Sequence, residues 1–430
     1  MTSSENSRIL VKFPTENITT DRAAGTLPAS GNVSFYLRLF NAVHPFTVPS
    51  DYTLMVKAVS RNWDEGTGID SDGYSDFGFC NWIIAQSSSG GGLVSWTSEG
   101  GDYQTKCIPQ VKCKSNEYEV IQRVLQKKSY RNVEKFIQEV FWRLYWRGWL
   151  ESRPRVWNDF LGDLKSLEKN KRYHSAIEGL TDIECFNYWV NELKENGYLH
   201  NHTRMWFASI WIFTLELPWQ LGAEFFLKYL TDADSASNTL SWRWVAGMQT
   251  KGKHYLAKDW NIEKFTNGKF SPAILNENAV PISDSRNYAF SKINYSGLET
   301  ESESVVMFEN ELNTDFLDNN NYKHAYFCLL SNEERQVKVS QENITYKESV
   351  VDNLAKRGTC NISKINGSQL ISLVQSSSNI HLVYPGVGDN LDFLNKNLMP
   401  NANCLVRRKE DIFCSQFSNK GFFNFKKNIP

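Results

Sequence analysis

The chain has 430 residues and nearly balanced charge, with 47 Lys and Arg against 48 Asp and Glu. Hydrophobic residues make up 41% of it, which excludes collagen-like and disordered chains, and the scattered cysteines exclude a small disulfide scaffold. The near-zero net charge neither requires nor excludes a nucleic-acid partner, and the length predicts about two to four domains.

Residues 1–113 have the pattern of an antiparallel β-sandwich. Apolar and polar residues alternate at 33–40 and 52–59, between stretches rich in Gly, Ser and Asp. The segments SRNWDEGTGID and SWTSEGGDY loosely resemble a β-sandwich module of phage structural proteins and DNRLRE-type surface domains. Asp70, Asp72 and Asp76 are either a calcium site or a polar loop, and we assign no metal to them.

Residues 114–275 change to helical periodicity. Apolar residues recur at helical spacing at 117–125 and 133–150, and further helices are expected near 183–195, 201–217, 220–230 and 237–248. Eleven of the 14 tryptophans fall between Trp142 and Trp260. This density indicates either a large aromatic core or a role in stacking or electron transfer, and both interpretations stay open on composition alone.

The last part of the chain predicts a linker and a small α/β domain. Residues 276–300 are polar and rich in Asn, Ser and Pro, as in a linker. From 301 to 430, strand-like stretches such as VVMF and HAYFCLL alternate with helix-like ones at 346–357 and 368–376, which favours parallel pairing. GVGDN at 386–390 follows a strand-like stretch but matches no phosphate-binding fingerprint, so we assign it no ligand.

One predicted helix carries unusual side chains on one face. Glu139, Trp142, Arg143 and Trp146 follow each other at i, i+3, i+4 and i+7. A carboxylate, two indoles and a guanidinium make a poor apolar core. They suit a pocket for a flat ring and an anion, and the alternative is a partly solvated helix with a Glu–Arg pair.

Two later segments add polar groups at helix starts. GYLHNHTRM at 197–205 begins a helix with His, Asn and Arg, and helix N-termini favour anions. In DADSASNTLSWRW at 232–244, Asp232 and Asp234 precede a helix, and one of them is expected to cap it. Asn238 and Trp242 are i, i+4 neighbours and share a face of that helix.

These segments together carry a family resemblance. EVFWR at 139–143, GYLHNHTRM and DADSASNTLSWRW are similar to the E-x-x-W-R, G-W-x-H-N-x-x-R-M and D-x-D-x-A-x-N-x-x-x-W-x-W motifs. In this order they resemble the FAD-binding catalytic domain of the photolyase/cryptochrome family, over about residues 120–270. The chain resembles a short bacterial branch without the N-terminal antenna domain, and GFFNFKKNIP at 421–430 resembles its end.

The resemblance implies a multidomain fold. The resemblance supplies its central part, an all-α FAD-binding photolyase-like domain at 114–275, and residue patterning supplies the rest: an N-terminal all-β sandwich at 1–113, a linker at 276–300 and a C-terminal small α/β domain at 301–430.

The resemblance also implies roles for individual residues. The residues expected to hold a U-shaped FAD are Arg143, Asn201, Arg204, Asp232, Asp234 and Asn238. The residues expected to line the cavity for a flipped pyrimidine dimer are Glu139, Trp142, Met205 and Trp244. Three residues match catalytic positions: Trp242 next to the flavin, Trp219 in the middle of the electron-transfer chain, and Asn201 near flavin N5.

The sequence departs from the family pattern in three places. A phosphate-cradling T-S-x-L-S segment is expected just before residue 114, where the chain reads GDYQTKCIPQVKCKS. His202 stands where the family has a second basic residue. The outer tryptophan of the electron-transfer chain is expected near Ala176, and the rings that could replace it are Tyr173, Trp206 and Trp211.

The expected function is therefore a blue-light-driven DNA lyase that uses FAD to split cyclobutane pyrimidine dimers in UV-damaged DNA. The alternatives are a cryptochrome-like photosensor without repair and a phage-type structural protein with a vestigial flavin domain. The apolar stretch 205–217 is too short to span a bilayer, and the first residues lack a signal-peptide pattern. We expect a cytoplasmic monomer without metal or membrane partner.

Overall fold

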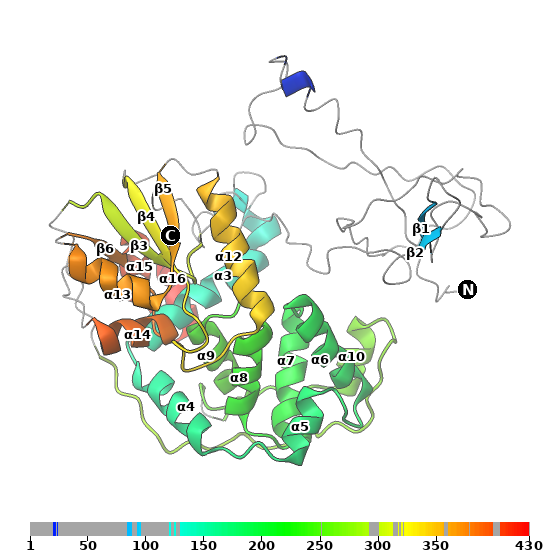
Figure 1. Ribbon diagram of the computed structural model, residues 1–430. Coiled ribbons are helices and arrows are strands. Elements are labelled where there is room, and N and C mark those ends of the chain that lie inside the picture. Colours follow the sequence, from blue (N-terminus) through cyan, green and yellow to red (C-terminus); the bar gives the residue numbers. More distant parts are fainter. Residues whose placement is uncertain are drawn as a thin grey trace. The chain divides into compact units, whose positions relative to one another are not determined.

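The computed structural model describes residues 130–429 except 251, 292–300, 313–316, 318–319, 321, 357–359, 378 and 399–404. It also describes short pieces before residue 130, at 20–22, 24, 84–87, 93–95, 120–121 and 124–125. The chain divides into two compact units, residues 1–109 and 110–430 (Figure 1).

In the first unit, the described secondary structure includes one strand pair. Strand β1 (Ile84–Ser87) pairs antiparallel with β2 (Leu93–Ser95). The rest of the predicted β-sandwich lies outside the described residues, and so do Asp70, Asp72 and Asp76. The sandwich therefore stays a prediction.

The second unit begins with a helical module in which the predicted helices are confirmed within a few residues. Helix α3 is the longest of these and spans 22 residues. The helices are α3 (Tyr130–Glu151), α4 (Arg155–Ser166), α5 (Lys171–Ile177), α6 (Glu184–Asn196), α7 (Asn201–Ser209), the π-helix η1 (Ile210–Thr214), α8 (Trp219–Tyr229), α9 (Ser235–Val245) and α10 (Asp259–Phe265).

Local chemistry explains where the helices around the site begin and end. Asp234 precedes α9, and its carboxylate accepts hydrogen bonds from the backbone N–H groups of Ala236 and Ser237, both at 3.0 Å. This side chain satisfies N–H groups that would otherwise lack a partner at the helix start. Helix α6 ends at Gly197, whose φ of +64° is the left-handed conformation that glycine adopts without strain.

Aromatic side chains form the core of the helical module. Trp157, Trp211 and Trp242 are fully buried, and Trp189, Trp206 and Trp219 are also buried. Most of the tryptophan cluster therefore serves the core, as the first of the two interpretations predicts. Gly222 of α8 makes room for two of these rings, because a Cβ atom there would lie 2.3 Å from Cη2 of Trp242.

The segment 271–291, which includes the start of the predicted linker, has no helix or strand but is tied to the helical module. Arg286 forms an ion pair with Asp163 of α4 at 2.9 Å, and Asp284 pairs with Arg243 of α9 at 3.3 Å. Arg243 and Asp284 are buried, so this segment contributes to the packing of the module rather than hanging free.

The C-terminal part of the second unit contains a five-stranded sheet in the order β5-β4-β3-β6-β7, with every neighbouring pair parallel. Figure 1 labels β3 to β6 of this sheet. The predicted parallel pairing is thus confirmed. The strands are β3 (Ser304–Phe308), β4 (His324–Cys328), β5 (Asn361–Ile365), β6 (His381–Val383) and β7 (Leu405–Val406).

Apolar side chains cover both faces of this sheet. Val305 and Met307 of β3 pack with residues of α12 (Gln341–Ala355) on one face. Val306 and Phe308 pack on the other face with α13 (Gly367–Ser376) and α14 (Asp389–Asn397). A parallel sheet is normally buried on both faces, and this arrangement meets that requirement.

Side-chain hydrogen bonds join the sheet module to the helical module. Asn343 of α12 donates to the carbonyl oxygens of Lys228 and Leu230 at 3.1 and 3.3 Å, and Trp157 donates to Asp392 of α14 at 2.8 Å. The last helices, α15 (Lys409–Ser415) and α16 (Phe422–Asn428), return to pack on α3. No helix among the described residues is long and apolar enough to cross a membrane.

Candidate functional site

Helix α3 separates two cavities. Every fourth residue from Glu139 to Glu151 lines the larger one, which we call the polar cavity. Trp142, Tyr145, Trp146 and Trp149 line the smaller one, the aromatic cavity. The face predicted to carry Glu139, Trp142, Arg143 and Trp146 together is therefore divided between two sites.

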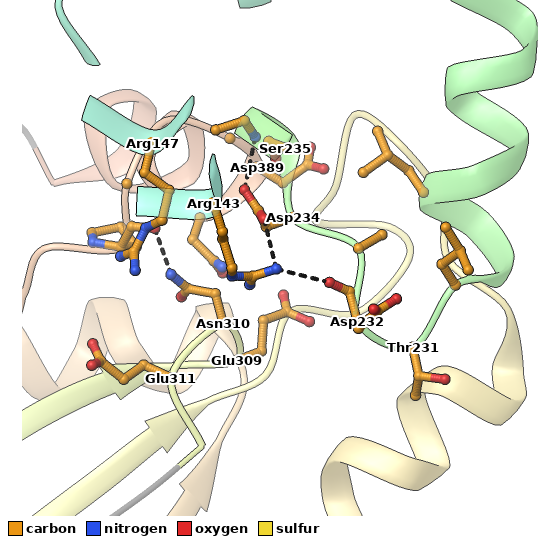
Figure 2. Close-up of a pocket in the computed structure, with 18 of the residues that line it drawn as sticks. Arg143, Arg147, Thr231, Asp232, Asp234, Ser235, Glu309, Asn310, Glu311 and Asp389 are labelled. Carbon is orange, nitrogen blue, oxygen red and sulfur yellow. Dashed lines mark hydrogen bonds and ion pairs between the residues drawn. The ribbon is translucent and has the colours of Figure 1, made fainter. Parts of the chain in front are cut away.

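The polar cavity has a volume of about 540 Å³. Its helical side includes α3 and the segment 230–236 that leads into α9, and its opposite side includes segments 309–312 and 385–390 of the sheet module (Figure 2). Ligand pockets in proteins commonly measure about 300–1,000 Å³, so this cavity is large enough for a cofactor.

Charged side chains predicted to bind FAD form one network at this cavity. Arg143 donates to Asp234 Oδ2 at 2.9 Å and to the backbone oxygen of Asp232 at 3.2 Å (Figure 2). Arg204 of α7 donates to both carboxylate oxygens of Asp232 at 3.0 and 3.1 Å. The network thus connects α3, α7 and the start of α9.

The aspartates have different local roles. Asp234 caps α9 through Oδ1, so the expectation that one of the pair is a helix cap is confirmed. Its Oδ2 accepts from Arg143 and from the Ser237 hydroxyl. The side chain of Asp232 is 54% exposed and pairs with Arg204, which leaves it accessible to a ligand.

Asn201 and Asn238 occupy contrasting positions. Asn201 is exposed at the start of α7 and donates to Glu139 Oε2 at 3.3 Å, which brings two predicted site residues together. Asn238 is buried, and its amide group donates to the carbonyl oxygen of Ala223 at 2.9 Å. Asn238 therefore joins α9 to α8, and a role at the cofactor stays a prediction.

The aromatic cavity has a volume of about 300 Å³ and brings together Trp142 and Trp244, the two rings predicted to stack on a flipped base. Trp146 and Trp149 add further indole surface. Gln249 also lines the cavity, and its side-chain oxygen is buried without a hydrogen-bond partner among the described residues. Sequence reasoning missed Gln249, because a lone glutamine five residues after Trp244 carries no motif signal.

One face of Trp142 is covered by the chain's own C-terminal helix. The ring of Phe422 at the start of α16 lies parallel to Trp142, with ring centres 3.5 Å apart and an angle of 7° between the planes. Gly421 and Phe422 also line the aromatic cavity. The cavity is therefore closed on this side by an aromatic stack.

The remaining predicted residues lie away from both cavities. Met205 is half-buried and lines neither cavity. Trp242 is buried in the core, where its ring contacts Trp211 edge-on at 6.2 Å. Trp211 in turn contacts Tyr173 at 6.0 Å, whereas Trp219 stacks on Phe160 and makes no ring contact with Trp242 within the described helices.

The sheet module adds buried charges that the sequence did not reveal. Glu309 directly follows β3 and forms ion pairs with Arg335 at 2.6 Å and Lys347 at 2.5 Å. Burial alone would raise the pKa of Glu309, but the two cations lower it below its usual value. The sequence did contain one signal for Glu309, namely its position directly after a predicted buried strand. The carboxyl ends of parallel strands lie at one edge of the sheet, where ligands commonly bind.

Asp389 at the start of α14 lines the same cavity, but its pKa is shifted in the opposite direction to that of Glu309. Burial raises its pKa to about 6, although the backbone N–H groups of Gln336 and Val337 and the charge of Arg335 act in the opposite direction. The neighbouring Asp392 raises it further. No group of three or more His, Cys, Asp or Glu that could hold a metal ion occurs in the described part of the chain.

The helical module thus combines a polar cavity large enough for a cofactor with an indole-lined cavity on the other side of α3. Residues 136–269 match the family described as the FAD binding domain of DNA photolyase. The helical module belongs to the photolyase/cryptochrome family of FAD-binding domains, and FAD is its cofactor.

Individual relatives agree with this assignment. The chain is 34% identical over 119 residues to a deoxyribodipyrimidine photo-lyase of Streptomyces griseus, covering 27% of this chain and 26% of the relative. It is 31% identical over 120 residues to that of Agrobacterium fabrum, covering 27% and 25%. It is 30% identical over 97 residues to a cryptochrome DASH of Idiomarina loihiensis, covering 23% and 21%.

The chain thus spans about a quarter of the length of these curated relatives. No solved structure matches it.

The residues of the polar cavity fit an FAD cofactor. The guanidinium group of Arg143 is suited to phosphate or ring carbonyl oxygens, and the carboxylates of Asp232 and Asp234 are suited to ribityl and ribose hydroxyl groups. The 540 Å³ volume accommodates a large part of a dinucleotide. Of the residues predicted to hold FAD, Arg143, Asp232 and Asp234 line this cavity and would hold it there, whereas Asn201 and Arg204 lie outside its lining and their roles stay predictions.

Proposed function

We propose that this protein is a light-driven, FAD-dependent DNA photolyase that splits cyclobutane pyrimidine dimers. The observation that carries the proposal is the aromatic cavity, which lies one helix away from the polar cavity and contains Trp142 and Trp244. A protein that only sensed light would not need a second cavity lined by indole rings. The names of the photo-lyase relatives support the same activity.

The aromatic cavity meets the physical needs of a flipped dimer. A base inside a duplex cannot reach a buried site, so it must leave the stack, and aromatic walls replace the lost stacking. Trp142 and Trp244 would provide these walls, and the unpaired amide oxygen of Gln249 would accept a hydrogen bond from a base edge. Glu139 lines the polar cavity and accepts a hydrogen bond from Asn201, so its role at the damaged bases stays a prediction from the resemblance.

FAD, when bound in its reduced form, supplies the excited electron that opens the cyclobutane ring and takes it back afterwards, so that no net oxidation occurs. The protein residues position the reactants. Arg143 and Asp232 would bind the cofactor, and Asn201 and Glu139 would keep each other's polar atoms oriented between the two cavities. The assignments of Trp242 and Trp219 to an electron-transfer chain stay predictions.

The test is the Trp244→Ala variant, with Trp260→Ala as the control because Trp260 is 61% exposed on α10. Stacking of a base on an aromatic ring contributes about 1–3 kcal/mol, so Trp244→Ala should weaken binding of a dimer-containing single strand by roughly 5- to 150-fold. Flavin content should not change, because Trp244 lines the other cavity. Trp260→Ala should behave as the wild type.

Binding is measured against an undamaged strand of the same sequence, together with a melting curve and the flavin absorption spectrum. An equal loss for damaged and undamaged strands would contradict the dimer cavity. A fall in melting temperature together with loss of flavin would assign Trp244 to the core instead.

One observation favours a photosensor as the second candidate. Phe422 already stacks on the face of Trp142 that a flipped base would use. In a photolyase, Phe422→Ala should free this face and strengthen binding of dimer-containing DNA. In a sensor, neither the wild type nor this variant should distinguish damaged from undamaged DNA, and Phe423→Ala serves as the control because Phe423 is 76% exposed.

A further inference from the structure

The order of strands in the sheet module marks one position where ligands bind in α/β folds. The chain starts at β3 in the middle, adds β4 and β5 on one side, and then adds β6 and β7 on the other. The direction of winding therefore reverses between β3 and β6. Ligands of open parallel sheets bind in the crevice outside the carboxyl ends of the strands at such a point.

The polar cavity occupies this crevice. Residues 309–312 directly follow β3, residues 385–390 follow β6 after Tyr384, and both segments line the cavity. The side-chain amide of Asn310 donates to the carbonyl oxygen of Pro385 at 2.7 Å and joins the two segments (Figure 2). The crevice faces Arg143 and Asp234, so one continuous cavity contains both the FAD-binding residues and the sheet's own ligand position.

The segment 386–390 approaches the helical module very closely. Gly386 and Gly388 have φ values of +75° and +150°, which other residues rarely adopt. A Cβ atom on Gly388 would lie 2.2 Å from the hydroxyl oxygen of Ser235, next to Asp234. Apart from its chain neighbours, no atom of the described residues lies within 4 Å of the equivalent point on Gly386, which leaves space at this part of the loop.

The polar groups of this loop and of the strand ends suit a nucleotide. Asn390 contributes a side-chain oxygen that is buried without a hydrogen-bond partner among the described residues. Asp389 in the loop after β6 adds a carboxylate, and carboxylates near strand ends bind ribose hydroxyl groups in nucleotide-binding sheets, whereas Glu309 and Glu311 already pair with cations of the sheet module. Arg143 and Arg147 of α3 bring guanidinium groups to the opposite wall.

We propose that segments 309–311 and 385–390 of the sheet module bind the adenosine diphosphate half of FAD, so that the cofactor is held between the helical and sheet modules. This proposal rests on the assignment of FAD to the polar cavity. It gives GVGDN at 386–390 a ligand that the sequence pattern alone did not indicate, and it places a second wall opposite Arg143 and Asp232. No covalent step is involved.

The experiment measures the dissociation constants of FAD, riboflavin and ADP for the full chain and three variants. Asn390→Ala removes the unpaired acceptor, and Val387→Trp fills the crevice from a half-buried position that lines it. Asn353→Ala is the control, because Asn353 is exposed on α12 and lies outside the cavity lining. Melting curves accompany each variant.

Loss of one hydrogen bond should weaken FAD and ADP binding about 3- to 10-fold in Asn390→Ala. Val387→Trp should weaken both by more than tenfold. Riboflavin, which has the flavin ring but no adenosine diphosphate, should bind the wild type and all variants equally. The control should match the wild type for all three ligands.

Two results would overturn the proposal. Equal losses for FAD and riboflavin would show that the variants disturb the flavin half or the fold, and unchanged FAD affinity in both crevice variants would place the adenosine diphosphate elsewhere. A wild type that binds no FAD would overturn this inference along with the cofactor assignment. Selective loss of FAD in a protein that fails to split dimers would support the inference and refute only the proposed lyase activity.

Discussion

Replacing Gly222 by alanine tests whether the tryptophan core is as closely packed as the structure indicates. The added Cβ would lie 2.3 Å from Cη2 and 2.5 Å from Cζ3 of Trp242, and 3.0 Å from Nε1 of Trp211. Carbon atoms in contact normally lie about 3.5–4.0 Å apart, so one of the rings or helix α8 must move by about 1 Å. Both rings are buried and cannot turn into solvent.

The expected effect is the difference of two terms. Overpacking a core lowers the free energy of unfolding by about 1–3 kcal/mol, and the upper part of this range applies because the added Cβ would clash with two rings. Replacing glycine by alanine within a helix raises the free energy of unfolding by about 1 kcal/mol, because alanine has the higher helix propensity. We therefore expect Gly222→Ala to lower the free energy of unfolding by about 1–2 kcal/mol, which corresponds to a fall in melting temperature of roughly 2–8 °C.

Gly162→Ala is the matched control. Gly162 lies within helix α4, and apart from the adjacent part of that helix no atom of the described residues lies within 4 Å of the position its Cβ would take. The same substitution there should raise the free energy of unfolding by up to about 1 kcal/mol. Thermal unfolding followed by tryptophan fluorescence compares the two variants. If Gly222→Ala were as stable as Gly162→Ala, the close contact with Trp242 and Trp211 would be refuted.

Three further predictions concern charge and electron transfer. Because the pKa of Asp389 is raised from 3.8 to about 6, its contribution to stability is present below pH 3.8 and lost as the pH rises through 6. The Asp389→Asn variant should remove up to about 3 kcal/mol of this pH dependence of the free energy of unfolding, measured in urea. A pH profile equal to that of the wild type would contradict this assignment. Glu309→Gln should lower the free energy of unfolding by about 3–5 kcal/mol, because it removes the negative charge that pairs with two buried cations. Glu303→Gln, at an exposed ion pair, is the control and should change the free energy of unfolding by less than about 1 kcal/mol. Similar losses in the two variants would refute the buried network. Trp211→Phe should slow the photoreduction of bound flavin by a thiol more than Trp219→Phe does, because Trp211 contacts two oxidisable rings, Tyr173 and Trp242. A larger effect of Trp219→Phe would instead favour the electron-transfer chain through Trp219 that the sequence predicts.

The sequence predicts well what depends on local spacing. Helical periodicity located α6 and α8 within one or two residues, and alternating strands and helices predicted the parallel pairing of β3 with β4. The capping role of one aspartate before α9 also followed from local chemistry. These features depend on neighbours in the chain, so a single sequence contains the information.

Features that depend on distant contacts were not predictable in the same way. Trp142 and Arg143 are adjacent in sequence but line different cavities, because the packing of α16 on one side of α3 and of the sheet module on the other divides the face. The stack of Phe422 on Trp142 joins residues 280 positions apart. The local sequence around Trp142 or Phe422 gives no indication that the two rings are in contact.

The return of the last residues to helix α3 has a consequence for how the protein is made. Tyr145 donates to the carbonyl oxygen of Lys420, and Lys426 pairs with Glu134, across separations of 275 and 292 residues. During synthesis, one flank of α3 therefore stays without these partners until residues 420–426 have left the ribosome. Contacts of such separation form slowly, and exposed indole surface favours aggregation meanwhile. We therefore expect chaperone supply and growth temperature to affect the yield of active protein more than codon choice in the early part of its message.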